Sequence, residues 1–400
     1  MIRLLALMPL AGIGLLLLAE AVSRWWLRHR SRYAVWPPFM RQEIRLARDV
    51  FPELEPRVRF YINSDGERGA EAPRDRRGLF RVLATGGSAV ECFALDQSSS
   101  WPAVLERLLT EPAMLRRLGA GGGSTRRVHV GNIGHSGVGA AELDLILERV
   151  LPQYEKLDLI LIMVGASDVY HWIEEGAPPS RPAARVPELL LFGAHPRKPM
   201  GWKPNRWALA EVARRARRRW LRPLEVKERA GEWQAQARIM RAQATDVRDT
   251  MPHAGVMVKN FETHFRRLCA RAMDHADRVI VMLQPWFEGD YTPEEAARFW
   301  HGGVGKPWKE RIRTYYGLDI VNRLLDLVHT RAAAVADDLG LDRVTLRSVL
   351  TQRARHYFDH DHYTPAGAAV VAQAVAAAVL RGGPARPNAV SRRGAVVQAS

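Results

Sequence analysis

Short apolar runs that alternate with helical patterns constrain the fold of this chain more than any other feature. Each main run is long enough for a buried strand, and helical periodicity follows it. The runs are LFRVLAT (79–85), RRVHVGN (126–132), LDLILIMVG (157–165), ADRVIVMLQP (276–285) and a shorter one, RVTL (343–346). Strands and helices in alternation predict an α/β fold with a central parallel sheet covered on both faces.

The helical segments between these runs carry their own end signals. Residues 98–110 form an expected helix with Ser100 as a plausible cap, and residues 139–154 and 327–340 form two more. The segment 170–250 breaks the rhythm with Pro-rich loops and a helix dense in Arg and Trp. We interpret it as a helical insertion beside the sheet.

The N-terminal 32 residues predict a hydrophobic anchor or a signal segment. The run LLALMPLAGIGLLLLAEAV (4–22) contains one charge, and Trp25, Trp26 and several Arg residues follow it. This aromatic and basic flank favours an uncleaved membrane anchor. Residues 33–79 indicate a linker and an irregular lead-in, residues 80–382 one α/β domain, and residues 383–400 a flexible tail.

The net charge of +16 raises the question of nucleic-acid binding. The excess is mostly Arg spread along the chain and is densest in ARRARRRWLRP (213–223), without a recognisable nucleic-acid-binding motif. Such a pattern favours a solvated basic surface, or one that faces anionic lipid, so we expect no nucleic-acid partner. Cys92 and Cys269 are the only cysteines, which excludes a disulfide framework.

Polar and small residues follow several predicted strand ends, where sites form in parallel sheets. They lie in TGGS (85–88), GNIGHSGVG (131–139) and VGASD (164–168). The two glycines before Ser88 allow a sharp turn that places its hydroxyl at the N-terminus of the next helix, where the helix dipole favours developing negative charge. By itself, Ser88 equally fits a helix cap.

The segment YFDHDHYTPAGAAVVAQAV (357–375) supplies the matching base. Thr364 and Pro365 predict a helix start, so His362 lies just before a helix and three residues after Asp359. On a tight turn the Asp359 carboxylate can hold imidazole Nδ1–H and leave Nε2 free to accept a proton from a hydroxyl. Together with Ser88, this pair predicts a Ser-His-Asp triad.

The ordered motifs resemble those of the SGNH, or GDSL-like, hydrolases over roughly residues 55–380. ATGGSAVECFALDQSSSWPAVLE is similar to the first block of that family, VGNIGHSG to the second, VGASD to the third and DHDH to the last. FYINSDGERG (60–69) is similar to a lead-in found in bacterial members. The resemblance implies a flavodoxin-like three-layer α/β/α sandwich.

Carried over by position, the resemblance implies that Ser88 is the nucleophile, His362 the base and Asp359 its orienting carboxylate. The backbone amides of Ser88 and Gly137 would donate to the oxyanion. Ser167 stands where the family has an Asn side chain as third donor, and a serine hydroxyl can rotate away. The loss of one oxyanion donor costs on the order of 100–1,000-fold in rate.

The expected function is therefore serine-dependent hydrolysis of an ester, with a small molecule, an acylated glycan or a lipid as substrate and without cofactor or metal. Two alternatives stay open: an O-acyltransferase that acts on a polysaccharide, and a catalytically weak, membrane-anchored scaffold that binds glycans. The family resemblance favours an extracytoplasmic domain, whereas the basic flank of the anchor favours the cytoplasmic side. The oligomeric state stays open.

A metal site is the chemical alternative to the triad. Imidazoles and carboxylates that can bind zinc gather in HYFDHDHYT, namely His356, His360 and His362 with Asp359 and Asp361. Several tryptophans fall after predicted strand ends or in inserted segments, and indole faces can stack on sugar rings. They are Trp172, Trp202, Trp207, Trp286, Trp300 and Trp308. Residues 285–308 are rich in Gly and Pro, which suggests a mobile lid.

Overall fold

The five predicted strands form one parallel sheet in the computed structural model, which describes residues 2–119, 125–155, 157–180, 187–197 and 203–381, with backbone alone over 2–10. The sheet has the order β10-β8-β5-β3-β4. Its members are β3 (Leu79–Gly86), β4 (Arg127–Asn132), β5 (Leu157–Met163), β8 (Ala276–Leu283) and β10 (Asp342–Thr345). This confirms the predicted α/β class and its central sheet.

The strand order has a switch point between β3 and β5. Counted along the chain, the five strands lie in the order 2-1-3-4-5, the doubly wound arrangement of flavodoxin-like folds. The chain therefore leaves β3 and β5 toward opposite sides of the sheet. Ligands bind in the crevice beyond the carboxyl ends of such strands, and Ser88 and Ser167 both follow strands at this point.

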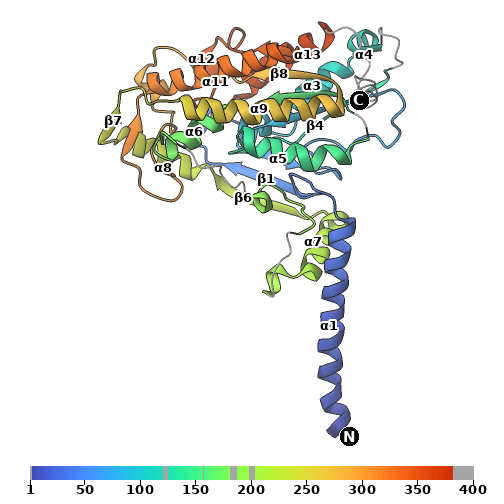
Figure 1. Cartoon of the computed structure of the whole chain (residues 1–400). Helices are drawn as coiled ribbons and strands as arrows, with labels where there is room; N and C mark the ends of the chain where they lie inside the picture. Colours follow the sequence, from blue (N-terminus) through green and yellow to red (C-terminus); the bar gives the residue numbers. More distant parts are fainter. Residues whose placement is uncertain (1, 120–124, 156, 181–186, 198–202, 382–400) are drawn as a thin grey trace, which may run out of the picture.

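Two apolar cores lie on the two faces of the sheet because alternate side chains of each strand point in opposite directions. Leu159 and Leu161 belong to one core and Ile160 and Ile162 to the other. Helices α3 (Trp101–Thr110) and α13 (Pro365–Arg381) pack into the first core. Helices α5 (Ala140–Val150), α9 (Gly255–His275) and α11 (Leu318–Asp338) pack into the second (Figure 1).

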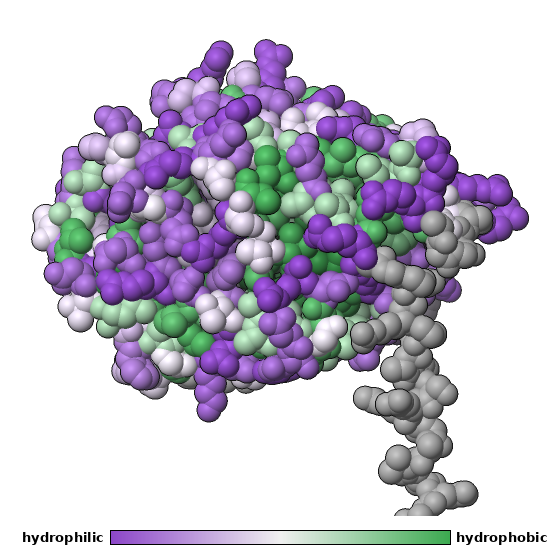
Figure 2. Space-filling model, turned by 90° about the horizontal axis from the view of Figure 1, so that it is seen from above, coloured by the Kyte–Doolittle hydropathy of each residue, from purple (hydrophilic) through white to green (hydrophobic). Residues whose placement is uncertain are grey.

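Shorter elements complete the layers. The remaining short helices are α2 (Ser88–Glu91), α4 (Pro112–Gly119), α6 (Ala166–Glu174), α8 (Glu232–Ala242), α10 (Pro293–Ala296) and α12 (Arg353–His356), with single 3-10 turns at Leu151–Gln153, Glu188–Leu190 and Pro204–Arg206. Strands β7 (Asp246–Arg248) and β9 (Thr314–Tyr316) form a parallel pair. The face of the molecule in Figure 2 is mostly hydrophilic, with apolar residues in separate patches.

A second sheet corrects two expectations about domain organisation. Strand β1 (Arg41–Leu46) pairs antiparallel with β2 (Arg57–Tyr61) and parallel with β6 (Leu224–Ala230). The segment 33–79 is therefore structured and not only a linker and irregular lead-in. The insertion expected at 170–250 is not purely helical, because β6 crosses it and joins the N-terminal strands.

Helix α1 (Ile2–Arg30) extends away from the sheet layers, with α7 (Ala208–Leu221) beside the half nearer to them (Figure 1). The Glu20 carboxylate of α1 accepts the backbone N–H groups of Ala208 and Leu209, so that it caps α7. In the described part of the chain, the structure contains no helix that is long and apolar enough to cross a membrane. The predicted anchor thus finds no support here, and the predicted tail at 383–400 lies outside the described residues.

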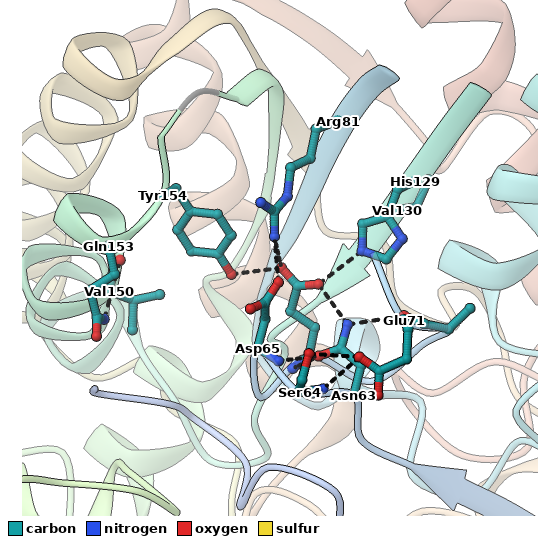
Figure 3. Close-up of polar contacts among 12 residues, drawn as sticks. Asn63, Ser64, Asp65, Glu71, Arg81, His129, Val130, Val150, Gln153 and Tyr154 are labelled. Atoms are coloured by element: carbon teal, nitrogen blue, oxygen red, sulfur yellow. Dashed lines mark hydrogen bonds and ion pairs between the residues drawn. The ribbon is translucent and has the colours of Figure 1, made fainter. Parts of the chain in front are cut away.

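The lead-in before β3 is held by a buried carboxylate. Glu67 is fully buried, and its oxygens accept from Tyr154 Oη at 2.7 Å, Asn63 Nδ2 at 2.9 Å and Arg81 Nη2 at 3.2 Å. His129 Nε2 lies 2.9 Å from the same carboxylate. These side chains come from segments far apart in the sequence and converge on one point (Figure 3), so this cluster joins the lead-in to the central sheet.

Candidate active site

The turn after β3 places Ser88 at the start of α2 and beside the end of β5. A Cβ atom on Gly86 would lie 1.9 Å from the carbonyl oxygen of Met163 in β5, so only glycine fits at this position. The backbone N–H of Gly87 donates to the same carbonyl oxygen at 3.3 Å. The predicted glycine turn thus has a specific cause, which is the close approach of two strand ends.

Asp359 and His362 meet on a tight hairpin turn, as their spacing predicts. His362 Nδ1 lies 2.8 Å from Asp359 Oδ2 and 2.9 Å from Asp359 Oδ1. The backbone N–H groups of Asp361 and His362 also donate to Asp359 Oδ1, at 3.1 and 2.9 Å. Thr364 accepts the N–H of Gly367 and caps α13, which fixes the turn next to a helix start.

Buried charges around this pair favour the imidazolium form of His362. Although burial opposes ionisation, the facing imidazole holds the pKa of Asp359 well below its usual range. Burial also disfavours the imidazolium, but the charges of Asp359 and Asp361 outweigh it and raise the pKa of His362 to about 10. Negative charges placed in this way stabilise the positive charge that an imidazole acquires when it accepts a proton.

One cavity of about 660 Å³ brings the candidate residues together. Its lining includes Ser88, Gly137, Ser167, Asp359 and His362, from four segments of the sequence. Among the described residues, no hydrogen bond joins Ser88 Oγ to His362. Contacts of this kind commonly tighten only when substrate binds.

The two remaining oxyanion candidates lie beside the Ser88 turn. A Cβ atom on Gly87 would lie 3.6 Å from Ser167 Oγ, so the Ser167 hydroxyl is close to the turn. Gly137 has a φ of +71°, in the left-handed region that favours glycine. The Asp168 carboxylate accepts the N–H of Ala140 at 3.0 Å, which ties the first turn of α6 to the start of α5.

Two residues that sequence reasoning missed hold the Ser88 turn in place. The buried guanidinium of Arg68 donates to the carbonyl oxygens of Glu91, Cys92 and Leu95, at 2.6, 2.7 and 2.6 Å. The Glu91 carboxylate accepts the backbone N–H of Ser136, next to Gly137. The lead-in motif GERG carried the only signal for this role, since it precedes the glycine turn.

The tryptophans separate into two groups. Trp172 and Trp286 are buried in the apolar core and cannot stack on a substrate, whereas Trp300 and Trp308 line the cavity. Trp207 precedes α7 as its N-cap, and Trp202 lies outside the described residues. The structure adds Trp233, which contacts Trp300 and Trp308 edge to face at centroid distances of 4.8 and 5.8 Å.

The histidine cluster expected as an alternative metal site has a different membership in the structure. His360 hydrogen-bonds to Tyr170 and Asn322, and His356 Nδ1 accepts the N–H of Gln352. Neither therefore joins His362. His301, from the segment expected to form a lid, takes their place beside Asp361. The mobility of this segment stays a prediction.

Comparisons with known proteins give structural similarity alone. No family model matches the chain, and no curated protein matches it. Similar solved structures include Axe2, an acetylxylan esterase from Geobacillus stearothermophilus, with 15% identity, a TM-score of 0.40 and coverage of 75% of this chain and 93% of that chain. LAE5, an α/β hydrolase enzyme from the metagenome of Lake Arreo, has 14% identity, a TM-score of 0.40 and coverage of 75% and 94%.

A member of the lipolytic protein G-D-S-L family from Veillonella parvula is also similar. It has 8% identity and a TM-score of 0.39, and the match covers 74% of this chain and 96% of that chain.

Proposed function

We propose that this chain is a serine-dependent ester hydrolase of the SGNH type, with Ser88, His362 and Asp359 as its triad. The observation that carries the proposal is the hydrogen-bonded His362–Asp359 pair, which lines the same cavity as Ser88. Ser88 also begins a helix at the switch point of the sheet. A serine hydroxyl is a weak nucleophile without a base, and His362 is the histidine of this cavity whose ring a carboxylate holds at 2.8 Å.

In the proposed reaction, Ser88 Oγ attacks the ester carbonyl while His362 Nε2 takes the hydroxyl proton. Asp359 holds Nδ1–H, which fixes the tautomer and stabilises the imidazolium. The backbone N–H groups of Ser88 and Gly137, with the Ser167 hydroxyl, donate to the oxyanion. His362 then protonates the leaving alcohol, and water releases the acyl group from Ser88 by the same steps in reverse.

The substrate proposal is an ester whose alcohol part is larger than methanol or ethanol. Trp233, Trp300 and Trp308 gather at one side of the cavity, and two of them are more than one third exposed. Exposed indole faces bind flat or ring-shaped groups. An acylated sugar fits this lining.

Hydrolysis of p-nitrophenyl acetate by the full chain and its Ser88→Ala variant tests the proposal. We expect the wild-type protein to turn over the ester and the variant to lose at least about 1,000-fold in kcat, because the covalent step needs the hydroxyl. Ser98→Ala is the matched control, because Ser98 lies outside the cavity lining, and it should keep wild-type activity. Equal activity of wild type and Ser88→Ala would refute the triad.

A further inference from the structure

A cluster of four side chains that can ligate a metal lies in the wall of the cavity, and it shares Asp359 and His362 with the proposed triad. His301, Asp359, Asp361 and His362 each offer one ligand atom, and these atoms all lie within 4.8 Å of one another. Asp361 Oδ1 lies 3.3 Å from His362 Nδ1 and 3.5 Å from His301 Nε2. Tetrahedral coordination with bonds of about 2.0–2.2 Å places ligand atoms about 3.3–3.6 Å apart, so these two separations already suit an ion.

The hydrogen bonding of Asp361 provides independent support. Asp361 is buried, with 2% of its surface exposed, and no hydrogen bond reaches its Oδ1 atom. A buried carboxylate oxygen without a donor is costly unless a charge compensates it. The other oxygen, Oδ2, accepts from Gln284 Nε2 at 3.4 Å, which leaves Oδ1 directed at the two imidazoles.

The surroundings hold the candidate ligands in place. Trp300 Nε1 donates to Asp359 Oδ2 at 3.3 Å, and the His301 ring stacks on Tyr170 at a centroid distance of 4.4 Å. Outer contacts of this kind orient ligands in metal sites. All four ligands line the large cavity, which gives an ion a path from solvent.

We propose that His301, Asp359, Asp361 and His362 bind a divalent transition-metal ion of the Zn²⁺ type. Two imidazoles and two carboxylates suit zinc and its neighbours, whereas Ca²⁺ and Mg²⁺ prefer oxygen ligands throughout. Binding at His362 Nδ1 displaces the proton shared with Asp359, which leaves to solvent. The neutral ring must then carry its hydrogen on Nε2 and cannot accept the Ser88 proton, so the ion inhibits the hydrolase; this consequence rests on the proposed function.

Zinc titration by isothermal calorimetry tests binding in the full chain, after dialysis against a chelator and then chelator-free buffer. We expect one ion per wild-type chain and at least about tenfold weaker binding in Asp361→Asn and in His301→Gln. His275→Gln is the matched control. His275 ends α9 directly before the first residue of β8, whereas the cavity lies beyond the carboxyl ends of the strands, so this variant should bind zinc as the wild type does.

A second experiment measures p-nitrophenyl acetate hydrolysis by each protein with and without zinc. The ratio of these two rates is compared between proteins, so that a difference in basal activity does not matter. Zinc should inhibit the wild type, and a chelator should restore its activity. The Asp361→Asn variant should resist inhibition by zinc. Thermal denaturation without zinc verifies that both ligand variants fold, and either folded variant suffices. Equal zinc affinity in wild type and variants overturns the site, and activity that requires zinc overturns the inhibitory role. The calorimetry stays decisive if no esterase activity exists.

Discussion

Replacing Glu67 with glutamine removes one negative charge from the interior and keeps the shape of the side chain. The carboxylate is fully buried and lies within hydrogen-bond distance of His129, Arg81, Asn63 and Tyr154. Burial raises its pKa, but His129, Arg81 and Asn63 outweigh burial and lower the pKa of Glu67 from 4.5 to about 2. A difference of about 2.5 units corresponds to about 3 kcal/mol of stability at neutral pH.

The sign of the pH dependence follows from this lowered pKa. Ionised Glu67 stabilises the fold above pH 4.5, and this contribution disappears as the pH falls from 4.5 toward about 2. The difference in unfolding free energy between wild type and Glu67→Gln should thus be about 3 kcal/mol at pH 7 and shrink over this window.

Urea denaturation, followed by circular dichroism at several pH values, measures this difference. The exposed side chain of Glu111 supplies a matched control, and Glu111→Gln should change the free energy of unfolding by less than about 0.5 kcal/mol. A Glu67→Gln variant as stable as the wild type at pH 7 would refute the reasoning. So would a difference that stays constant from pH 7 to pH 3.

Further predictions concern the Ser88 turn and the cavity. Arg68→Met leaves three buried carbonyl oxygens without their donor. It should lower the free energy of unfolding, measured by urea denaturation, by at least about 3 kcal/mol and should also slow ester hydrolysis. An unchanged free energy of unfolding together with an unchanged rate would contradict this role. Gly86→Ala forces a Cβ atom against the carbonyl oxygen of Met163 and should lower the free energy of unfolding by at least about 2 kcal/mol. A melting temperature equal to that of the wild type would exclude the close approach of Gly86 to Met163. Trp308→Ala should raise KM for an acetylated sugar roughly fivefold, which corresponds to about 1 kcal/mol of lost contact energy, and should leave KM for p-nitrophenyl acetate unchanged. An equal rise in KM for both esters would refute a contact between Trp308 and the alcohol part of the substrate.

The sequence predicts the central sheet well because its strands are buried on both faces. Runs such as 159–165 are apolar throughout, so composition alone marks them. Strands β1 and β6 escaped detection because they mix charged and apolar residues, as in RQEIRL and LEVKERA, and most of β6 is exposed. Their pairing joins residues far apart in the sequence, such as Arg41 with Leu224, which no local pattern reveals.

The residues of the candidate site also fall into those that the sequence predicts and those that it misses. Ser88, Asp359 and His362 lie in local motifs whose turns and helix starts are visible in the sequence. His301 and Arg68 act through contacts with segments that are distant in the chain. A histidine in a loop carries no local mark of such contacts. The lead-in motif of Arg68 signals only that it precedes the glycine turn, so the tertiary structure is needed to identify the contacts of both residues.

Covalent labelling tests the central claim, that Ser88 is an activated nucleophile, most directly. The full chain is treated with a fluorophosphonate, and peptide mass spectrometry then locates the adduct. We expect one adduct per chain on Ser88, none in Ser88→Ala, and strongly slowed labelling in His362→Gln, because the base activates the hydroxyl. No adduct, an adduct at another serine, or labelling of Ser88 at the same rate without His362 would contradict the account.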